Sequence, residues 1–129
     1  MLSRIIIENW RDPEGPASSS WQRAVRKALI HACRESDTPG FREEDTVSVF
    51  FGSCYIPGGE ANENPEVATI LFEGPYLGLQ ARKDFAIVLG RALLGYLPVG
   101  WRVDALPRLY DRREAGAILI NADGTPVES

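Results

Sequence analysis

Four charged residues follow one another as Asp-Arg-Arg-Glu at residues 111–114, between two apolar stretches. An apolar strand that starts at Trp101 precedes them, and a second apolar run at residues 117–120 follows. The two arginines favour the ionised form of the neighbouring Glu114. Charged side chains at the end of a rigid strand commonly line a pocket, and a solvated hairpin tip is the alternative interpretation.

A histidine and two cysteines are the other side chains with chemical potential. His31 lies in a helical pattern between alanines, where a packed and hydrogen-bonded histidine is favoured over a catalytic one. Cys33 and Cys54 have no metal-binding spacing, and their surroundings are apolar. We therefore expect buried thiols in a reducing compartment, with a disulfide as the less favoured alternative. Pro-Gly-Gly at residues 57–59 lacks the length and the following Lys-Ser/Thr of a phosphate loop, which argues against nucleotide binding.

Length and charge limit the class of protein. A chain of 129 residues fits one domain with one core. The net charge is −4, and no cluster of lysines and arginines stands out, which argues against a nucleic-acid partner. The three-residue isoleucine run before Glu8 is too short for a signal peptide or a membrane span. We expect a soluble cytoplasmic protein without a metal, a cofactor or a membrane partner.

The first half of the chain predicts a strand, a helix and a strand. The isoleucine run in residues 4–10 indicates a central strand, and the proline- and glycine-rich stretch after it is a loop. Serines at residues 18–20 offer N-cap hydroxyls to an amphipathic helix of about 16 residues with a solvated basic stripe. Alternation and β-branched residues predict a strand at residues 46–51.

The second half repeats this order after a loop at residues 57–65. A strand is expected at residues 67–72, and helical spacing of apolar residues begins at Leu79. Pro98 and Gly100 are expected to end that helix. The stretch from Trp101 then supplies the fourth strand and a short C-terminal hairpin arm, with a turn at residues 123–124.

These elements make two βαβ units, at about residues 1–56 and 66–121, within one domain of residues 1–129. Right-handed crossovers would place both helices on one face of a four-stranded sheet, which is an α/β (α+β) fold. The uncovered apolar face implies an oligomer. An unrelated ferredoxin-like module, with antiparallel pairing throughout, is the alternative with the same element order.

Three features resemble the tautomerase superfamily, in particular its longer members, the cis-3-chloroacrylic acid dehalogenase-like group. The first is the tandem βαβ layout in a chain of suitable length. The second is the stretch of residues 47–51, a variable loop and residues 67–74, which is similar to the middle of those proteins. The third is the stretch of residues 101–116, which resembles their strand that begins with tryptophan and closes on a Glu-aromatic-Gly turn, here Glu114-Ala115-Gly116. The resemblance covers most of the chain and, because those relatives are trimers, implies a homotrimer.

The family works from an amino-terminal proline that acts as base, acid or nucleophile in an apolar pocket. The matching position here is Met1, and Leu2 is too large for the usual removal of methionine, so the resemblance implies a primary amine. An α-amino group has a reference pKa of about 7.7 to 8.0, which desolvation or nearby cations lower further. Such an amine is reactive near neutral pH and, unlike that of proline, can form a neutral imine that loses a proton.

Other family positions match unevenly. The two arginines that hold the substrate carboxylate in the dehalogenases match Phe72 and Pro75, and the family's tyrosine on the last strand matches Val103. Phe72 and Val103 would therefore contact substrate without a charge. The family's helix histidine matches a place two residues after His31. Dehalogenation by the relatives' mechanism is not expected, because most of the groups it needs are absent.

Two site residues keep their type in this comparison. Glu114 matches the acid that activates water in the relatives, and Arg11 matches by direct count the arginine that short tautomerases use for substrate carboxylates. The alternative for Arg11 is a solvated loop cation paired with Asp12 or Glu14.

Two functions follow from the resemblance. The first is a tautomerase or isomerase that acts on a small enol, keto acid or aldehyde through the Met1 amine, with Glu114, Arg11 and His31 as candidate assisting groups. The second is a superfamily member that has lost its chemistry and serves as an oligomeric binding or structural protein.

Overall fold

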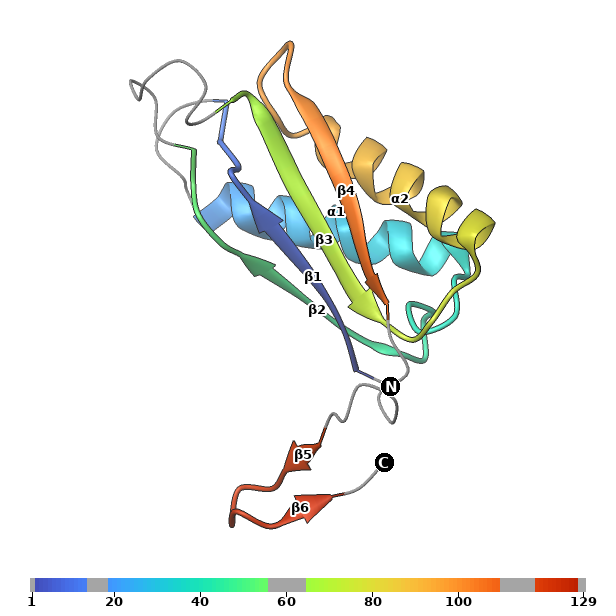
Figure 1. The fold of residues 1–129 in the computed structure, drawn as a ribbon. Helices are drawn as coiled ribbons and strands as arrows, with labels where there is room; N and C mark the ends of the chain where they lie inside the picture. The colour runs from blue at the N-terminus through green and yellow to red at the C-terminus, as the bar shows by residue number, and fades with distance from the viewer. Residues whose placement is uncertain (1, 14–18, 56–64, 110–117, 128–129) are drawn as a thin grey trace.

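The computed structural model describes residues 2–13, 19–55, 65–109 and 118–127 (Figure 1). The helices and long strands of this part lie where the apolar periodicity predicts them. In chain order the elements are β1 (Leu2–Glu8), α1 (Ser19–Ser36), β2 (Thr46–Phe51), β3 (Val67–Gly74), α2 (Leu79–Leu94), β4 (Arg102–Leu109), β5 (Leu119–Ile120) and β6 (Pro126–Val127).

The four long strands form one sheet in the order β2-β1-β3-β4. β1 pairs with β2 and β3 pairs with β4 in parallel, whereas the two central strands β1 and β3 are antiparallel. Each parallel pair is joined through a helix, and both helices cover the same face of the sheet (Figure 1). The predicted fold of two βαβ units is confirmed. The ferredoxin-like alternative is excluded, because its sheet would be antiparallel throughout.

The face of the sheet under the helices carries the core. Alternate residues of a strand point to the same face, so Ile5 and Ile7 of β1 and Ile70 and Phe72 of β3 are fully buried there. The apolar stripes of the two helices pack onto these residues. Those stripes consist of Trp21, Val25, Leu29 and Cys33 from α1 and of Phe85, Leu89 and Leu93 from α2.

The three tryptophans are buried and pack against other aromatic rings. Trp10 stacks on Trp21 with ring centroids 5.1 Å apart, and Trp101 meets Tyr55 edge-on at 4.9 Å. Both stacked indoles also donate hydrogen bonds to backbone carbonyl groups, which satisfies their polar atoms inside the core.

The opposite face of the sheet has no helix over it in the described chain, and we call it the open face. A row of apolar residues, one from each strand, crosses it: Phe50, Ile6, Leu71 and Leu106. The two outer members, Phe50 and Leu106, are 49% and 41% exposed. This is the face for which the sequence predicts a partner subunit, and that expectation stays a prediction.

The C-terminal hairpin forms, although it is separate from the main sheet. β5 pairs only with β6 in a two-stranded sheet of their own, so the second apolar run is not a fifth strand beside β4. The turn falls at the predicted place, with Gly124 at a φ of +87° and the Asp123 carboxylate accepting a hydrogen bond from the Thr125 backbone N–H. The charged residues 111–114 lie outside the described residues. We call residues 118–127 the arm.

Three expectations need correction. Cys33 is buried as predicted, but Cys54 is exposed, because Trp10 and Tyr55 fill the core beside it; both thiols are free. His31 is not packed: its side chain is 74% exposed on α1, and its Nε2 lies 3.9 Å from Glu35 Oε1. Helix α2 ends at Leu94 with a glycine as its C-cap, before the proline and glycine expected to end it.

Candidate functional site

All four strands have a terminus at one end of the sheet, which we call the Leu2 end, and β2 begins there opposite the start of β1. β1 begins there, and because β3 and β4 run antiparallel to β1, both of them finish there. In the register, Arg4 lies opposite Glu73, and Glu73 lies opposite Arg108. Met1 precedes β1 directly, and Glu114 follows the end of β4 by five residues. Both residues lie outside the described ones, so the structure fixes the strands that lead to them and not their side chains.

A charged cluster lies on the open face at this end, and we call it the Arg–Glu–Arg cluster (Arg4, Glu73 and Arg108). Arg4 Nη2 is 2.8 Å from Glu73 Oε2, and Arg108 Nη1 is 3.9 Å from Glu73 Oε1. The two guanidinium groups are 56% and 63% exposed, whereas the carboxylate between them is only 13% exposed. Two cations around one anion give the cluster itself a net charge of +1.

The cluster is suited to hold an anion. Its Arg4 makes a direct charge-assisted hydrogen bond to the carboxylate, whereas the guanidinium of Arg108 at 3.9 Å keeps donors for another partner. The apolar row of the open face lies next to the cluster, because Ile6 is two residues from Arg4 on β1 and Leu71 is two residues from Glu73 on β3. A carboxylate with an apolar body would therefore meet a cation and an apolar surface side by side.

Packing beneath the sheet fixes the start of β1. The hydroxyl of the buried Ser3 donates a 2.6 Å hydrogen bond to the carbonyl oxygen of Gly40. A Cβ atom on Gly40 would lie 2.3 Å from the Pro75 ring, and one on Gly74 would lie 2.9 Å from Ser3 Oγ. Glycine at these two positions therefore lets the loop after α1 and the turn after β3 pack closely at the start of β1, where a residue with a side chain would overlap its neighbours.

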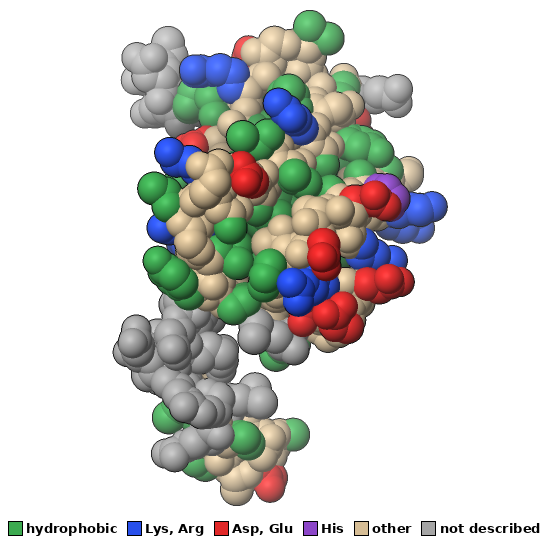
Figure 2. All heavy atoms as spheres, turned by 90° about the vertical axis from the view of Figure 1, so that its right-hand side faces the viewer, with side chains coloured by type: hydrophobic (Ala, Val, Ile, Leu, Met, Phe, Trp, Pro, Cys, Tyr) green, Lys and Arg blue, Asp and Glu red, His purple; other side chains and the backbone are tan. Residues whose placement is uncertain are grey.

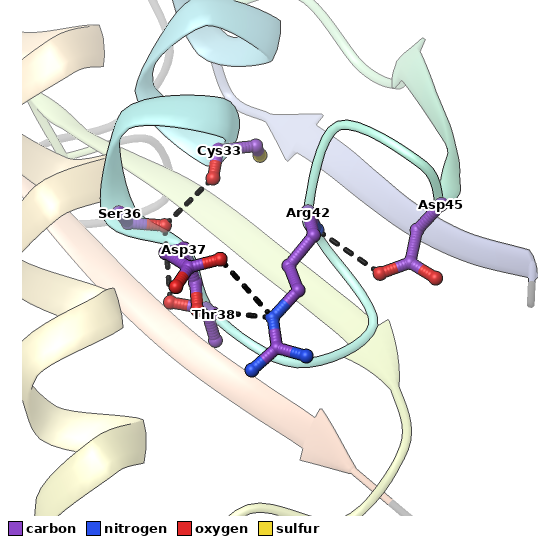
Figure 3. A network of polar contacts seen from close by, with 6 residues as sticks. All are labelled: Cys33, Ser36, Asp37, Thr38, Arg42 and Asp45. Carbon is purple, nitrogen blue, oxygen red and sulfur yellow. Dashed lines mark hydrogen bonds and ion pairs between the residues drawn. The ribbon is translucent and has the colours of Figure 1, made fainter.

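The loop that carries this contact, residues 37–45, is held by its own polar network (Figure 3). Arg42 Nε lies 3.1 Å from Asp37 Oδ1, and the Arg42 backbone N–H donates to Asp45 Oδ2 at 3.0 Å. At the end of α1, the Ser36 hydroxyl donates to the carbonyl oxygen of Cys33 at 2.8 Å. The loop is therefore a fixed support for β1.

The buried thiol near this loop does not act as a nucleophile at neutral pH. Burial raises the pKa of Cys33 from 9.0 to about 12. A thiol is nucleophilic as thiolate, so this residue serves packing.

Arg11 lies at the opposite end of the sheet. It follows the end of β1, and its Cζ atom lies 5.4 Å from the centroid of the Tyr55 ring. The seven residues of β1, at roughly 3.3 Å each, separate the two ends by about 20 Å. One chain does not bring Arg11 to the Leu2 end.

Nor does the structure bring the other predicted residues to the cluster. The His31 side chain is exposed to solvent on α1. Phe72 is fully buried in the core, where its ring meets those of Phe41 and Phe85 edge-on. Val103 belongs to the same face of the sheet as Phe72, and it borders a surface groove.

This groove runs between α2 and β4 and has a volume of about 570 Å³; we call it the α2–β4 groove. Hydrophobic side chains gather on this side of the molecule (Figure 2). Two arginines, Arg91 and Arg102, are its charged lining residues. The full lining consists of Ala86, Ile87, Gly90, Arg91, Leu94, Trp101, Arg102, Val103 and Ala105.

The sequence patterns single out neither the Arg–Glu–Arg cluster nor the groove. A signal for the cluster exists, since Arg4 and Glu73 interrupt apolar strands at open-face positions. These charged residues predict a cluster only once the register shows that they lie side by side on neighbouring strands. Within the described ranges, no group of three or more His, Cys, Asp or Glu side chains is placed to bind a metal ion. Neither described helix is long and apolar enough to cross a membrane.

Comparison with known proteins adds the fold family. No family model and no curated protein matches the sequence. Among solved structures, a fused 4-OT symmetric trimer matches with a TM-score of 0.58 and 15% identity over 98% of this chain and 95% of its own. MIF2 of Leishmania major matches with a TM-score of 0.59 and 14% identity over 98% and 96%. The macrophage migration inhibitory factor of Toxoplasma gondii matches with 0.58 and 14% over 98% and 100%. The chain therefore has the mixed α/β fold of the tautomerase and MIF-like proteins.

Proposed function

We propose that this chain is a tautomerase-superfamily protein without the amino-terminal proline, and that it interconverts the keto and enol forms of a small acid at the Leu2 end of its sheet. The Met1 amine is the base, and Glu114 assists it. The observation that carries this proposal is the register. It brings the start of β1, the end of β4 and a cluster of net charge +1 to one end of one sheet.

The chemistry follows from these groups. A neutral amine removes a proton from the carbon beside the substrate carbonyl group, and the same proton is returned to the carbonyl oxygen through Met1 or Glu114, so no other reactant is needed. A cation beside such an amine lowers its pKa and so favours the neutral form. Arg108 holds the substrate carboxylate, while Glu73 fixes Arg4 beside it. Among an enol, an aldehyde and a keto acid, this arrangement favours the keto acid.

The site is proposed to form within a homotrimer. The open face exposes an apolar row in the single chain, and burying such a row is favourable. Arg11 takes part only if it comes from another copy, because β1 holds it at the opposite end from Met1 in its own chain. The fused 4-OT protein with this fold is a symmetric trimer, which supports the same arrangement here.

The experiment measures keto–enol conversion of an arylpyruvate by its ultraviolet absorbance, with a neutral enol-forming aldehyde as second substrate. Acetylation of the amino terminus, or its extension by a few residues, is expected to abolish turnover of both. Intact mass confirms that Met1 is present before the modification. Unchanged turnover after acetylation would refute the role of the amine.

The substrate preference is tested by Arg108→Gln. Loss of a hydrogen bond to a charged group costs about 1.5–3 kcal/mol, so KM for the arylpyruvate should rise about 10- to 100-fold while that for the aldehyde changes little. Arg23→Gln, on the exposed side of α1, is the matched control. Equal effects of Arg108→Gln on both substrates would contradict carboxylate binding by this arginine.

The second candidate function is an oligomeric binding or structural protein without turnover. It is favoured by Phe72, which stands where the dehalogenases hold the substrate with an arginine and which is fully buried here. This candidate predicts no conversion of arylpyruvates, enols or halogenated acrylates by a protein that still assembles. Turnover that disappears on acetylation would rule it out.

A further inference from the structure

We propose that Arg82, in the first turn of α2, anchors a binding site for a small tetrahedral oxyanion such as phosphate. The site lies at the Leu2 end, where β3 ends at Gly74 and α2 begins five residues later, on the side of the sheet that the helices cover. It is separate from the Arg–Glu–Arg cluster on the open face, and it does not depend on the chemistry of the proposed function.

Arg82 stands where helical periodicity predicts an apolar residue. The stripe of α2 that packs on the sheet consists of Phe85, Leu89 and Leu93, at steps of four residues. Arg82 precedes Phe85 by three residues, so it continues this stripe by one turn toward the start of the helix, and it is partly buried. A cation in line with the core is costly unless an anion or hydrogen-bond acceptors meet it.

The guanidinium of Arg82 has a donor that nothing in the described part of the chain accepts. Its Nε atom is buried and has no hydrogen-bond partner. The carboxylate nearest to it in the sequence, that of Asp84, instead accepts a 2.8 Å hydrogen bond from Gln80. The ion pairs between described residues do not include Arg82 either. Buried donors in native proteins are paired with few exceptions, and a bound ion is one explanation of such an exception.

Tyr76 contacts the cation without satisfying this donor. The centroid of its ring lies 5.7 Å from Arg82 Cζ, and the π face of the ring attracts the positive charge. A ring face is a weak acceptor, so it does not replace the oxygen atom that the Nε–H group requires. The Tyr76 side chain is 67% exposed, so little packing opposes its displacement by an anion that enters the site.

The start of α2 supplies further donors at the same place. A helical side chain extends toward the N-terminus of its helix, and the contact with Tyr76 shows that Arg82 does so. The N-cap residue there, Gly78, makes no side-chain cap, and the first turn has no acidic residue. The backbone N–H groups of this turn therefore lack a side-chain acceptor, and they carry the positive end of the helix dipole. A Cβ atom on Gly78 would meet nothing within 4 Å, so a ligand has room beside them.

These donors select the shape of the ligand. The Nε–H and Nη–H groups of an arginine form a fork that two oxygen atoms of one anion accept, and the N–H groups at a helix start bind a further oxygen. A tetrahedral phosphate offers oxygen atoms in all these directions, whereas a carboxylate offers two in one plane. We therefore expect phosphate to bind more tightly than acetate.

Proton–nitrogen NMR of the arginine side chains tests the site. Phosphate is added at constant ionic strength, and the Nε–H signal that is lost in Arg82→Lys is assigned to Arg82. This signal is expected to move as phosphate binds and to reach saturation, and acetate should move it only at higher concentration. The wild-type titration stands by itself if a variant does not fold.

Two variants measure the contribution of the arginine. The dissociation constant of phosphate is taken from the backbone N–H signals of residues 79–81. Arg82→Gln should raise it about 10- to 100-fold, because hydrogen bonds between charged groups are lost. The matched control is Lys83→Gln, which removes the same charge from the next residue, an exposed one, and should change the constant less than about twofold.

Three results would overturn the proposal. They are an Arg82 signal that does not respond to phosphate, equal weakening of phosphate binding by the Arg82 and Lys83 variants, and an Arg82 signal that responds to an arylpyruvate but not to phosphate. In the last case the position would belong to the substrate. None of these measurements needs turnover, so phosphate binding by a protein without keto–enol conversion would refute the proposed function alone.

Discussion

Substituting alanine at two glycines with the same backbone conformation tests how tightly the Leu2 end is packed. Gly40 and Gly100 have φ values of +86° and +87°. A methyl group on Gly40 would lie 2.3 and 2.4 Å from two atoms of the Pro75 ring, whereas one on Gly100 would meet nothing within 4 Å. The pair therefore separates the cost of the backbone conformation from the cost of overlap.

The magnitudes follow from these contacts. A left-handed conformation costs a residue with a Cβ atom about 1–2 kcal/mol, and this is the whole cost expected for Gly100→Ala. Overpacking adds about 1–3 kcal/mol for Gly40→Ala, since a proline ring cannot rotate away. For a chain of 129 residues, each kcal/mol lowers Tm by about 4 °C. We expect a fall of about 4–8 °C for Gly100→Ala and about 8–20 °C for Gly40→Ala.

The assay is thermal and urea unfolding followed by circular dichroism. Because the Gly40 carbonyl accepts the hydrogen bond of Ser3 next to Leu2, Gly40→Ala should also reduce any turnover that depends on Met1, and Gly100→Ala should not. Equal losses of stability in the two variants would refute the close packing at Pro75.

Three further predictions concern the core. The pKa of Cys33 is raised to about 12, so a thiol reagent at neutral pH should modify only Cys54 in the folded protein and both thiols in urea. Equal rates of modification of Cys33 and Cys54 in the folded protein would contradict the burial of Cys33. The pKa of Cys33 in the folded state lies above its unfolded value of 9.0, so the folded state holds this proton more tightly. The resulting contribution to the free energy of unfolding is complete below pH 9 and is lost between about pH 9 and 12. Compared with Cys33→Ala, the wild-type protein should therefore lose about 1.4 kcal/mol of stability per pH unit in this range. Phe72→Ala should lower the free energy of unfolding in urea by about 3–5 kcal/mol, because Phe72 is fully buried, and a loss no larger than that of the half-exposed Phe50→Ala would contradict its place in the core.

Element positions follow from the sequence because they depend on neighbours along the chain. A β-branched run such as residues 5–7 and helical spacing from Leu79 are local signals, and short connections leave few ways to arrange two βαβ units. The four-stranded sheet with both helices on one face is therefore predictable from the sequence. The ends of elements are less predictable: α2 ends at Leu94, with Gly95 as its C-cap, before Pro98 is reached.

Exposure of single side chains was harder to predict. His31 and Cys54 both have apolar neighbours in the sequence, and both are exposed. For His31, the periodicity of helix α1 turns Leu29 and Cys33 toward the sheet and leaves the histidine between them on the exposed side. For Cys54, the side chains of Trp10, which is distant in the sequence, and of the adjacent Tyr55 occupy the core beside it.

The candidate site depends on tertiary structure alone. Arg4, Glu73 and Arg108 are far apart in the sequence, and they meet only because β3 pairs with both β1 and β4 in one register. A shift by one residue would turn each of these side chains to the other face of the sheet. The sequence by itself determined the helices, the strands and their layering, through periodicity and chain connectivity. Register and packing decided which charges meet at the Leu2 end, which end of the sheet holds Arg11, and that the arm stands apart from its own sheet.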